Sequence, residues 1–138
     1  MLTRGAHHVS LIVRDVERAR EFYGGLLGLE ELERPDFGLP GAWYQAGSVQ
    51  LHLLEPPAGQ DAGSPPEELT PLAAHLAFEV EDYEETREEF ESLGIRVLGF
   101  GADVGQFFVK DPDGNVLEFI VPGGNLGRQS SQSSGEKS

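Results

Sequence analysis

The second half of the sequence repeats the first at a nearly constant offset. His8 and His75 stand 67 positions apart, and His52 and Glu118 stand 66 positions apart. A difference of one residue in the length of the two helical segments accounts for the change. Self-similarity at a fixed offset indicates that one structural unit occurs twice, which restricts the chain to folds built from two like halves.

Each half predicts one β-α-β-β-β unit. Apolar residues alternate with polar or small ones where we expect strands, and recur every three to four positions where we expect helices. Asp15 and Asp82 stand at the expected helix N-caps, and Gly28 and Gly94 stand where the helices end. The expected strands are 6–13, 29–33, 42–46 and 49–55 in the first half and 73–80, 95–100, 106–110 and 116–121 in the second, with helices at 15–27 and 82–93.

These elements predict an α+β fold. Two tandem β-α-β-β-β modules, residues 5–55 and 73–121, are expected to form one curved mixed sheet with both helices on its convex side. They make up a single domain, residues 1–122. Residues 56–71 are rich in Pro and Gly, which is typical of a linker. Residues 123–138 are polar and low in complexity, and we expect a disordered tail there.

Composition excludes several classes of function. The formal net charge of −14 disfavours binding to nucleic acid, whose phosphates are bound by Lys and Arg. The absence of cysteine excludes disulfides and thiolate ligands. No apolar run reaches the roughly 20 residues that a membrane span needs, and we find no signal peptide before the first strand. We therefore expect a soluble cytoplasmic protein that binds neither nucleic acid nor membrane.

Four polar side chains occupy matched places in the repeats, in the first and the last strand of each. The large apolar residues of these strands stand on the alternate positions, which must cover the helix, so the polar side chains face the other way. If the halves pair about a pseudo-twofold axis, all four converge on the concave face of the sheet. Imidazole and carboxylate together suit Zn, Ni, Co, Mn or Fe. The candidate metal ligands are His8, His52, His75 and Glu118.

The facing of His52 is left open by the sequence. Five residues separate it from the turn at Gly47, whereas four separate Glu118 from Gly114. His52 therefore reaches the face of the other ligands only if a bulge or a longer turn takes up one residue. Otherwise it is a polar lining residue that touches no metal. His7 points by alternation to the helix side or to the sheet edge, and we expect no metal role for it.

Four segments resemble the vicinal oxygen chelate superfamily, which includes glyoxalase I, methylmalonyl-CoA epimerase, extradiol dioxygenases, fosfomycin-resistance thiol transferases and bleomycin-resistance proteins. They are HVSLIVRDVERAREFYGGLLGL (8–29), VQLHLLE (49–55), HLAFEVED (75–82) and KDPDGNVLEFI (110–120). The resemblance covers residues 4 to about 122. It implies a deep U-shaped sheet around a divalent metal that chelates two neighbouring oxygens of the substrate, and it maps the metal positions onto the four candidate ligands.

The resemblance further implies a metal-dependent, glyoxalase-like lyase or isomerase that acts on a small substrate through an enediolate held by the metal. Glu118 is the expected catalytic base, because the base must lie within hydrogen-bond reach of the proton it removes. Trp43, Tyr44 and Phe107 are the expected substrate-lining residues. Single two-module chains of this superfamily often pair, so we also expect a homodimer, which would cover exposed sheet edges.

Two other activities fit the same pattern. Glyoxalase I usually has glutamate where His52 stands, and a glutathione adduct needs basic partners of which this chain has few. Extradiol dioxygenases bind their metal through two His and one Glu, which would fit if His52 is not a ligand. A non-enzymatic protein that sequesters a cationic drug, as bleomycin-resistance proteins do, fits the acidic charge but needs no ligand set.

Overall fold

A computed structural model describes residues 1–124, and these fall into two compact units. The first unit comprises Met1–Ser64 together with Asp111–Asn115. The second comprises Pro65–Lys110 and the described residues from Val116 onward. The division follows the sequence repeat, with the boundary in the expected linker. The tail predicted to be disordered lies outside the described residues, apart from its first two positions.

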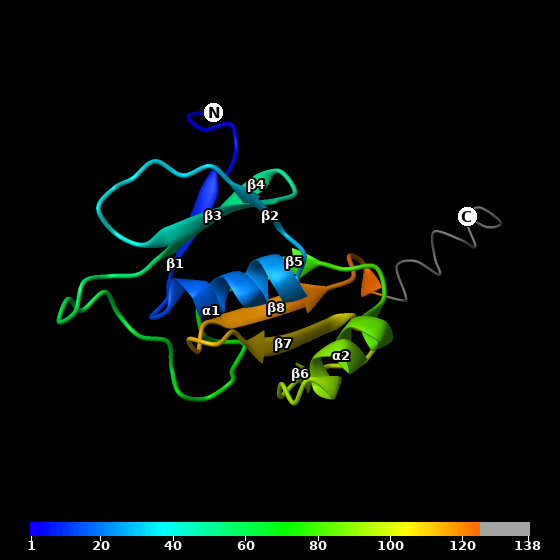
Figure 1. The fold of residues 1–138 in the computed structure, drawn as a ribbon. Helices are drawn as coiled ribbons and strands as arrows, with labels where there is room; N and C mark the ends of the chain where they lie inside the picture. The colour runs from blue at the N-terminus through cyan, green and yellow to red at the C-terminus, as the bar shows by residue number, and fades with distance from the viewer. Residues whose placement is uncertain (125–138) are drawn as a thin grey trace. The chain divides into compact units, whose positions relative to one another are not determined.

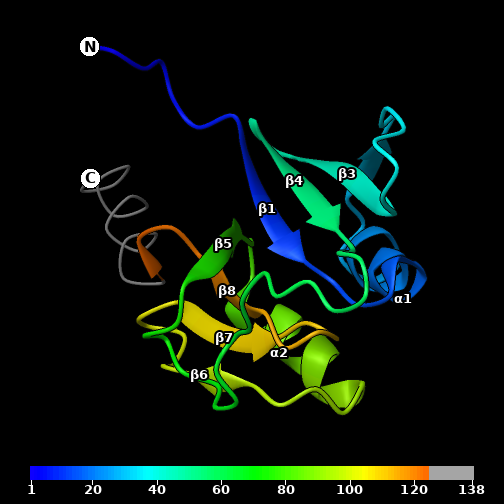
Figure 2. The same cartoon turned by 90° about the vertical axis from the view of Figure 1, so that its left-hand side faces the viewer.

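The first unit contains a four-stranded mixed sheet of strand order β1-β4-β3-β2. Strand β1 pairs in parallel with β4, and the other neighbours are antiparallel. Figure 2 shows β1, β4 and β3 side by side. The strands are β1 (His8–Ile12), β2 (Glu30–Leu32), β3 (Gly41–Ala46) and β4 (Val49–Leu54).

The second unit repeats this topology with the order β5-β8-β7-β6. Strand β5 pairs in parallel with β8, and β7 is antiparallel to both of its neighbours. The strands are β5 (His75–Glu79), β6 (Leu98–Gly99), β7 (Gln106–Lys110) and β8 (Val116–Ile120), and the labels are shown in Figure 1. The duplicated α+β architecture predicted from the sequence is confirmed.

The prediction of one continuous sheet is corrected, because the strands form two separate four-stranded sheets. The physical reason lies in the connections. Each tight hairpin pairs the third and fourth strands of a repeat, and the helix returns the chain so that its first strand lies beside the fourth. Every backbone ladder is therefore made within its own repeat.

The first helix begins as predicted but changes its hydrogen-bond pattern midway. Asp15 caps it by accepting bonds from the N–H groups of Glu17 and Arg18. Helix α1 (Val16–Arg20) then continues as the π-helical segment η1 (Glu21–Leu26) instead of as one α-helix to residue 27. The segment contains two consecutive glycines, which are poor α-helix formers. At Gly24 a Cβ would lie 3.3 Å from the hydroxyl oxygen of Tyr44, so glycine lets the helix pack closely on the sheet.

The second helix, α2 (Tyr83–Ser92), matches its prediction within one residue at each end. Asp82 accepts a hydrogen bond from the N–H of Glu85, and Gly94 follows the helix with φ of 79°. Positive φ favours glycine at that position. Among the described residues, no helix is long and apolar enough to cross a membrane.

Each helix covers one face of the sheet in its own unit. In the first unit Tyr23 packs near Tyr44, with ring centroids 6.5 Å apart, and both side chains are buried. In the second unit Phe90 contacts Phe107 and Phe119 at centroid distances of 5.8 and 4.9 Å. The opposite face of each sheet carries His52 and Trp43 in the first unit, and Glu118 and Phe108 in the second.

The turn Asp111–Asn115, which joins β7 to β8, belongs to the first unit. The Tyr23 hydroxyl donates to Asp111 Oδ2 over 2.6 Å, and both residues are buried. The amide of Asn115 donates to the carbonyl of Ile12, and Arg18 forms an ion pair with Asp113. Burial, with the negative charge of Asp111 second, raises the pKa of Tyr23 well above its ordinary value. These polar bonds anchor the turn.

Replacing Tyr23 by Phe should destabilise the protein, because it leaves a buried carboxylate oxygen of Asp111 without its shortest donor. We expect a loss of about 1–3 kcal/mol of unfolding free energy, measured by urea denaturation. Tyr44→Phe is the matched control, since its hydroxyl lies 3.4 Å from Glu31 and makes a weaker bond. Equal losses in the two variants would contradict the anchoring role of the Tyr23–Asp111 bond.

Candidate active site

In the first unit, three aromatic rings stack on the sheet face that the helix does not cover. His52 lies opposite Trp43 in the antiparallel ladder, and their rings are parallel with centroids 4.1 Å apart. On its other side, His52 stacks on His8 at 4.0 Å. The two-residue turn Gly47-Ser48 places His52 on the same face as His8. The orientation that the sequence left open is thereby decided in favour of a shared face.

Each of these two imidazoles is held by one hydrogen bond within the unit. His52 Nε2 lies 2.9 Å from Gln50 Oε1, and His8 Nδ1 lies 2.9 Å from His7 Nδ1. Burial lowers the pKa of His52, and the neighbouring His8, His7 and Arg34 act in the same direction. A neutral ring is favoured, which is the form that binds a metal.

The second unit brings His75 and Glu118 together, also on the face away from its helix. His75 Nε2 lies 3.1 Å from Glu118 Oε1, and Gln106 Nε2 donates to Glu118 Oε2 over 2.7 Å. On the other side of the His75 ring, Nδ1 lies 2.7 Å from the carbonyl of Ala73. Glu118 is only 6% exposed, so these contacts, more than water, hold its two oxygens in place.

Gln106 is a functional candidate that the sequence analysis missed. It is the first residue of β7, two positions before Phe108, which lies opposite Glu118 in the ladder. Strand alternation therefore places Gln106 on the Glu118 face. That register could have been read from the predicted hairpin, but only once Glu118 had been paired with the right residue of the preceding strand.

Of the three predicted lining residues, only Trp43 is on a histidine face. Tyr44 and Phe107 are 1% and 0% exposed, and both lie on the faces that the helices cover. Adjacent residues of a strand point to opposite faces, so a shift of one position along the strand moves a side chain from the site face to the core. In the second unit the ring on the site face is Phe108, whose edge contacts His75 at a centroid distance of 5.0 Å.

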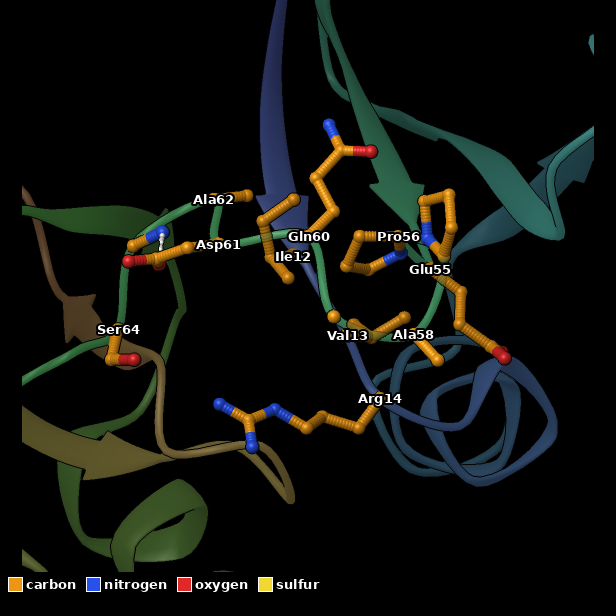
Figure 3. Close-up of a pocket in the computed structure, with 13 residues that line it drawn as sticks. Ile12, Val13, Arg14, Glu55, Pro56, Ala58, Gln60, Asp61, Ala62 and Ser64 are labelled. Carbon is orange, nitrogen blue, oxygen red and sulfur yellow. Dashed lines mark hydrogen bonds between the residues drawn. The ribbon is translucent and has the colours of Figure 1, made fainter.

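A pocket of about 440 Å³ in the first unit lies at the other end of β1 from His8. Ile12, Val13 and the linker residues Glu55–Ser64 form most of its lining, and Arg14 extends along its rim (Figure 3). Asp61 is engaged by the N–H of Gly63, and Glu55 by the N–H of Val16. None of the four candidate ligands lines this pocket.

Comparison with known proteins identifies the family. The profile of the Glyoxalase/Bleomycin resistance protein/Dioxygenase superfamily matches residues 5–119. The chain belongs to this superfamily. It is 29% identical to Glyoxylase I 4 of Arabidopsis thaliana over 81% of this chain and 67% of the relative. It is 30% identical to the glutathione transferase FosA of Serratia marcescens, over 87% of this chain and 82% of that protein.

The fold also matches solved members of the superfamily. A crystal structure assigned to the glyoxalase family, from Bacillus anthracis, superposes with a TM-score of 0.71 at 30% identity. The match covers 88% of this chain and 97% of the other. These relatives carry different reactions in their names, so membership fixes the fold and leaves the reaction to be argued from the site.

The pair in the second unit fits a divalent metal. A carbonyl and an ionised carboxylate both only accept hydrogen bonds, whereas a neutral imidazole has a single N–H. With Nδ1–H directed at Ala73, His75 Nε2 and Glu118 Oε1 need either a proton or a cation in common. His75 Nε2 and Glu118 Oε1, 3.1 Å apart, are the atoms that would hold a divalent ion, and such an ion would supply Lewis acidity there.

The three candidate histidines share a further property of metal ligands in proteins. Ligating imidazoles usually have their second nitrogen held by a neighbouring acceptor, which fixes the tautomer. The neighbours here are His7, Gln50 and Ala73, which leaves His8 Nε2, His52 Nδ1 and His75 Nε2 for a ligand. Among residues 1–124, no group of three or more His, Asp or Glu side chains lies close enough to hold one ion. Within each unit, two of the candidate ligands lie on one sheet face.

Replacing Gln106 by Leu should weaken metal binding, because the carboxylate of Glu118 loses the donor that orients it. Losses of about 10- to 100-fold in affinity are typical for such outer contacts. Gln60→Leu, in the exposed linker, is the matched control and should bind metal like the parent. Isothermal titration with Zn²⁺, Mn²⁺ and Ni²⁺ measures both; unchanged affinity in the Gln106 variant would remove this residue from the site.

Proposed function

We propose that this chain is a metal-dependent enzyme of the glyoxalase-like lyase or isomerase type, acting on a small substrate with two neighbouring oxygens. The observation that carries the proposal is the buried carboxylate of Glu118, held between His75 and Gln106. Burying an ionisable group costs free energy unless it is paired or ligated. Two acceptors that face one imidazole need a proton or a cation in common, and we propose the cation.

The proposed ligands are His8, His52, His75 and Glu118, one pair from each repeat. The donor set of imidazole nitrogen and carboxylate oxygen suits Zn, Ni, Co, Mn or Fe. When bound, such an ion supplies Lewis acidity to two neighbouring oxygens of the substrate and stabilises the negative charge that develops on them. The chain's own residues then determine which proton moves and how the substrate is oriented.

Glu118 is the proposed catalytic base. A carboxylate that is mostly excluded from water and held at both oxygens keeps a fixed direction, so it can accept a proton from a carbon next to a carbonyl without reorienting. Gln106 holds Oε2 in place. Trp43 and Phe108 supply apolar surface beside the two pairs, and we propose them as the substrate-lining residues in place of Tyr44 and Phe107.

A second candidate function is favoured by one observation on His52. Its ring is sandwiched between Trp43 and His8, and its Nε2 is engaged by Gln50. If these contacts give His52 a lining role, the remaining ligands are His8, His75 and Glu118. Two histidines and one carboxylate match the metal ligands of extradiol dioxygenases. Sequestration of a cationic drug is less well supported, because a cation of the chain itself, Arg34, already lies over the Phe37 ring beside Trp43.

The parent protein should bind one of the five candidate ions at a ratio close to one per chain, measured by elemental analysis after expression with each ion. His75→Ala and Glu118→Gln should each lose the ion, because each removes half of the pair in the second unit. Glu68→Gln is the control: it removes one negative charge, as Glu118→Gln does, but from an exposed linker position. This variant should retain the ion. A parent that binds none of the five ions, or variants that keep them, would contradict the proposed function.

The His52→Ala variant separates the two candidate reactions. Loss of the ion together with proton-transfer activity supports four ligands. Retention of Fe²⁺, with oxygen consumed in the presence of catechols, supports the three-ligand dioxygenase. A metal-free variant that still folds is recognised by an unchanged far-ultraviolet dichroism spectrum.

We also propose a homodimer, which the resemblance to two-module members of the superfamily implies. Light scattering at micromolar concentration should give twice the 15.0 kDa chain mass. A monomer across the accessible concentration range would contradict it. A cytoplasmic location stays a prediction from composition.

A further inference from the structure

Arg34 presents two buried nitrogen atoms that have no hydrogen-bond partner. They are Nε and Nη2, which together form the side edge of the guanidinium group. This edge carries two parallel N–H groups and is the part of arginine that binds a carboxylate through two bonds at once. Leaving buried donors of a charged group unsatisfied costs free energy, so the position calls for an acceptor.

The guanidinium lies on the same face of the first sheet as the stacked rings. A Cβ at Gly41 would come within 2.8 Å of Arg34 Cζ and Nη2, so the group rests against that glycine. Gly41 and Trp43 are two positions apart in β3, and strand alternation puts them on one face. Glycine at this position leaves the space that the guanidinium fills.

The segment between β2 and β3 is a loop that contains both Arg34 and the aromatic residue Phe37; Figure 1 shows where the loop runs. Phe37 lies 5.2 Å from Arg34 Cζ, and its centroid is 6.0 Å from that of Trp43. The Phe37 side chain is 59% exposed, so it can move aside at little cost in buried apolar area. Asp36, the nearest acid in the chain to the C-terminal side, is engaged by the N–H of Gly38.

We infer that Arg34 binds a carboxylate of the substrate, with Phe37 displaced from the guanidinium as the anion enters. The inference rests on the proposed function and narrows its substrate class to small acids. The Phe37 ring contacts both the guanidinium and Trp43, and Trp43 in turn stacks on His52, so the proposed carboxylate position is distinct from the candidate ligand His52. A flat carboxylate matches the two parallel N–H groups, whereas a phosphate would bring further oxygens against the Gly41 backbone and the apolar ring.

The negative net charge of the chain explains why a bound carboxylate would need a local cation such as Arg34. A chain with a formal charge of −14 repels anions at long range. Uptake of a carboxylate therefore needs a local, desolvated cation with its hydrogen bonds unspent, and Arg34 supplies both. Arg18, Arg20 and Arg87, by contrast, form ion pairs with acidic side chains of their own units.

The test uses full-length protein stripped of metal with a chelating resin, titrated with glutarate at constant ionic strength. Trp43 is the only tryptophan, so displacement of the neighbouring Phe37 should change its fluorescence. Calorimetry provides a second readout. We expect saturable binding by the parent and no saturable binding by Arg34→Met. Arg34→Lys keeps the positive charge but lacks the two parallel N–H groups, and it should bind glutarate at least about 10-fold more weakly.

Arg14→Met is the matched control, because Arg14 is exposed at the rim of the separate pocket and the change in charge is the same. It should bind glutarate like the parent. Equal binding by the parent and both Arg34 variants, or an equal response to chloride alone, would overturn the inference. Tighter binding of inorganic phosphate than of glutarate at Arg34 would overturn the carboxylate assignment.

Failure of the proposed function is distinguishable from failure of this inference. A chain that takes up no metal but binds glutarate through Arg34 would refute the enzyme and retain the anion site. A chain that binds metal through His75 and Glu118, with no difference between parent and Arg34→Met in the metal-free titration, would refute only the anion site.

Discussion

The parallel pairing of the first and last strands of each repeat is the interaction on which the candidate site depends. It sets His8 and Ser10 beside Gln50 and His52 in one sheet, and His75 and Ala77 beside Val116 and Glu118 in the other. Because neighbouring residues in a strand face opposite ways, this register also directs Leu51 and Phe119 to the helix side. A slip of one residue would exchange the site face and the core face in either unit.

The small residues on the site faces are a consequence of that arrangement. Ser10 lies next to His52 in the ladder, and Ala77 lies next to Glu118. Their short side chains leave room for the stacked imidazoles in one unit and for the His75–Glu118 contact in the other. On the opposite faces, Tyr23 and Phe90 from the helices fill the space against Tyr44 and Phe107. Each sheet thus packs against its helix on one face and carries the candidate ligands on the other.

Electrostatics divides the charged residues of the first unit into two groups. Arg18 and Arg20 are neutralised by Asp113 and by acidic neighbours, as is common for exposed arginines, where such pairs contribute little to stability. Arg34 is held against the Gly41 backbone with its side edge unsatisfied. In a strongly acidic chain, this contrast distinguishes an arginine with a surface role from one kept available for a ligand.

The sequence by itself determined the duplication, the order of elements, both helix caps and the facing of His8, His75 and Glu118. Those features depend on local periodicity and on a fixed offset, which can be read from the chain alone. The tertiary structure added the Gln106–Glu118 contact, the triple stack on His52, the core positions of Tyr44 and Phe107, and the buried, unpartnered side edge of Arg34. Each depends on which residue of one strand stands opposite which residue of another, or on a loop laid over a strand. The continuation of α1 as the π-helical η1 was likewise not predicted from the sequence. Contacts between residues distant in sequence decide these details, and local periodicity alone does not give the strand register on which they depend.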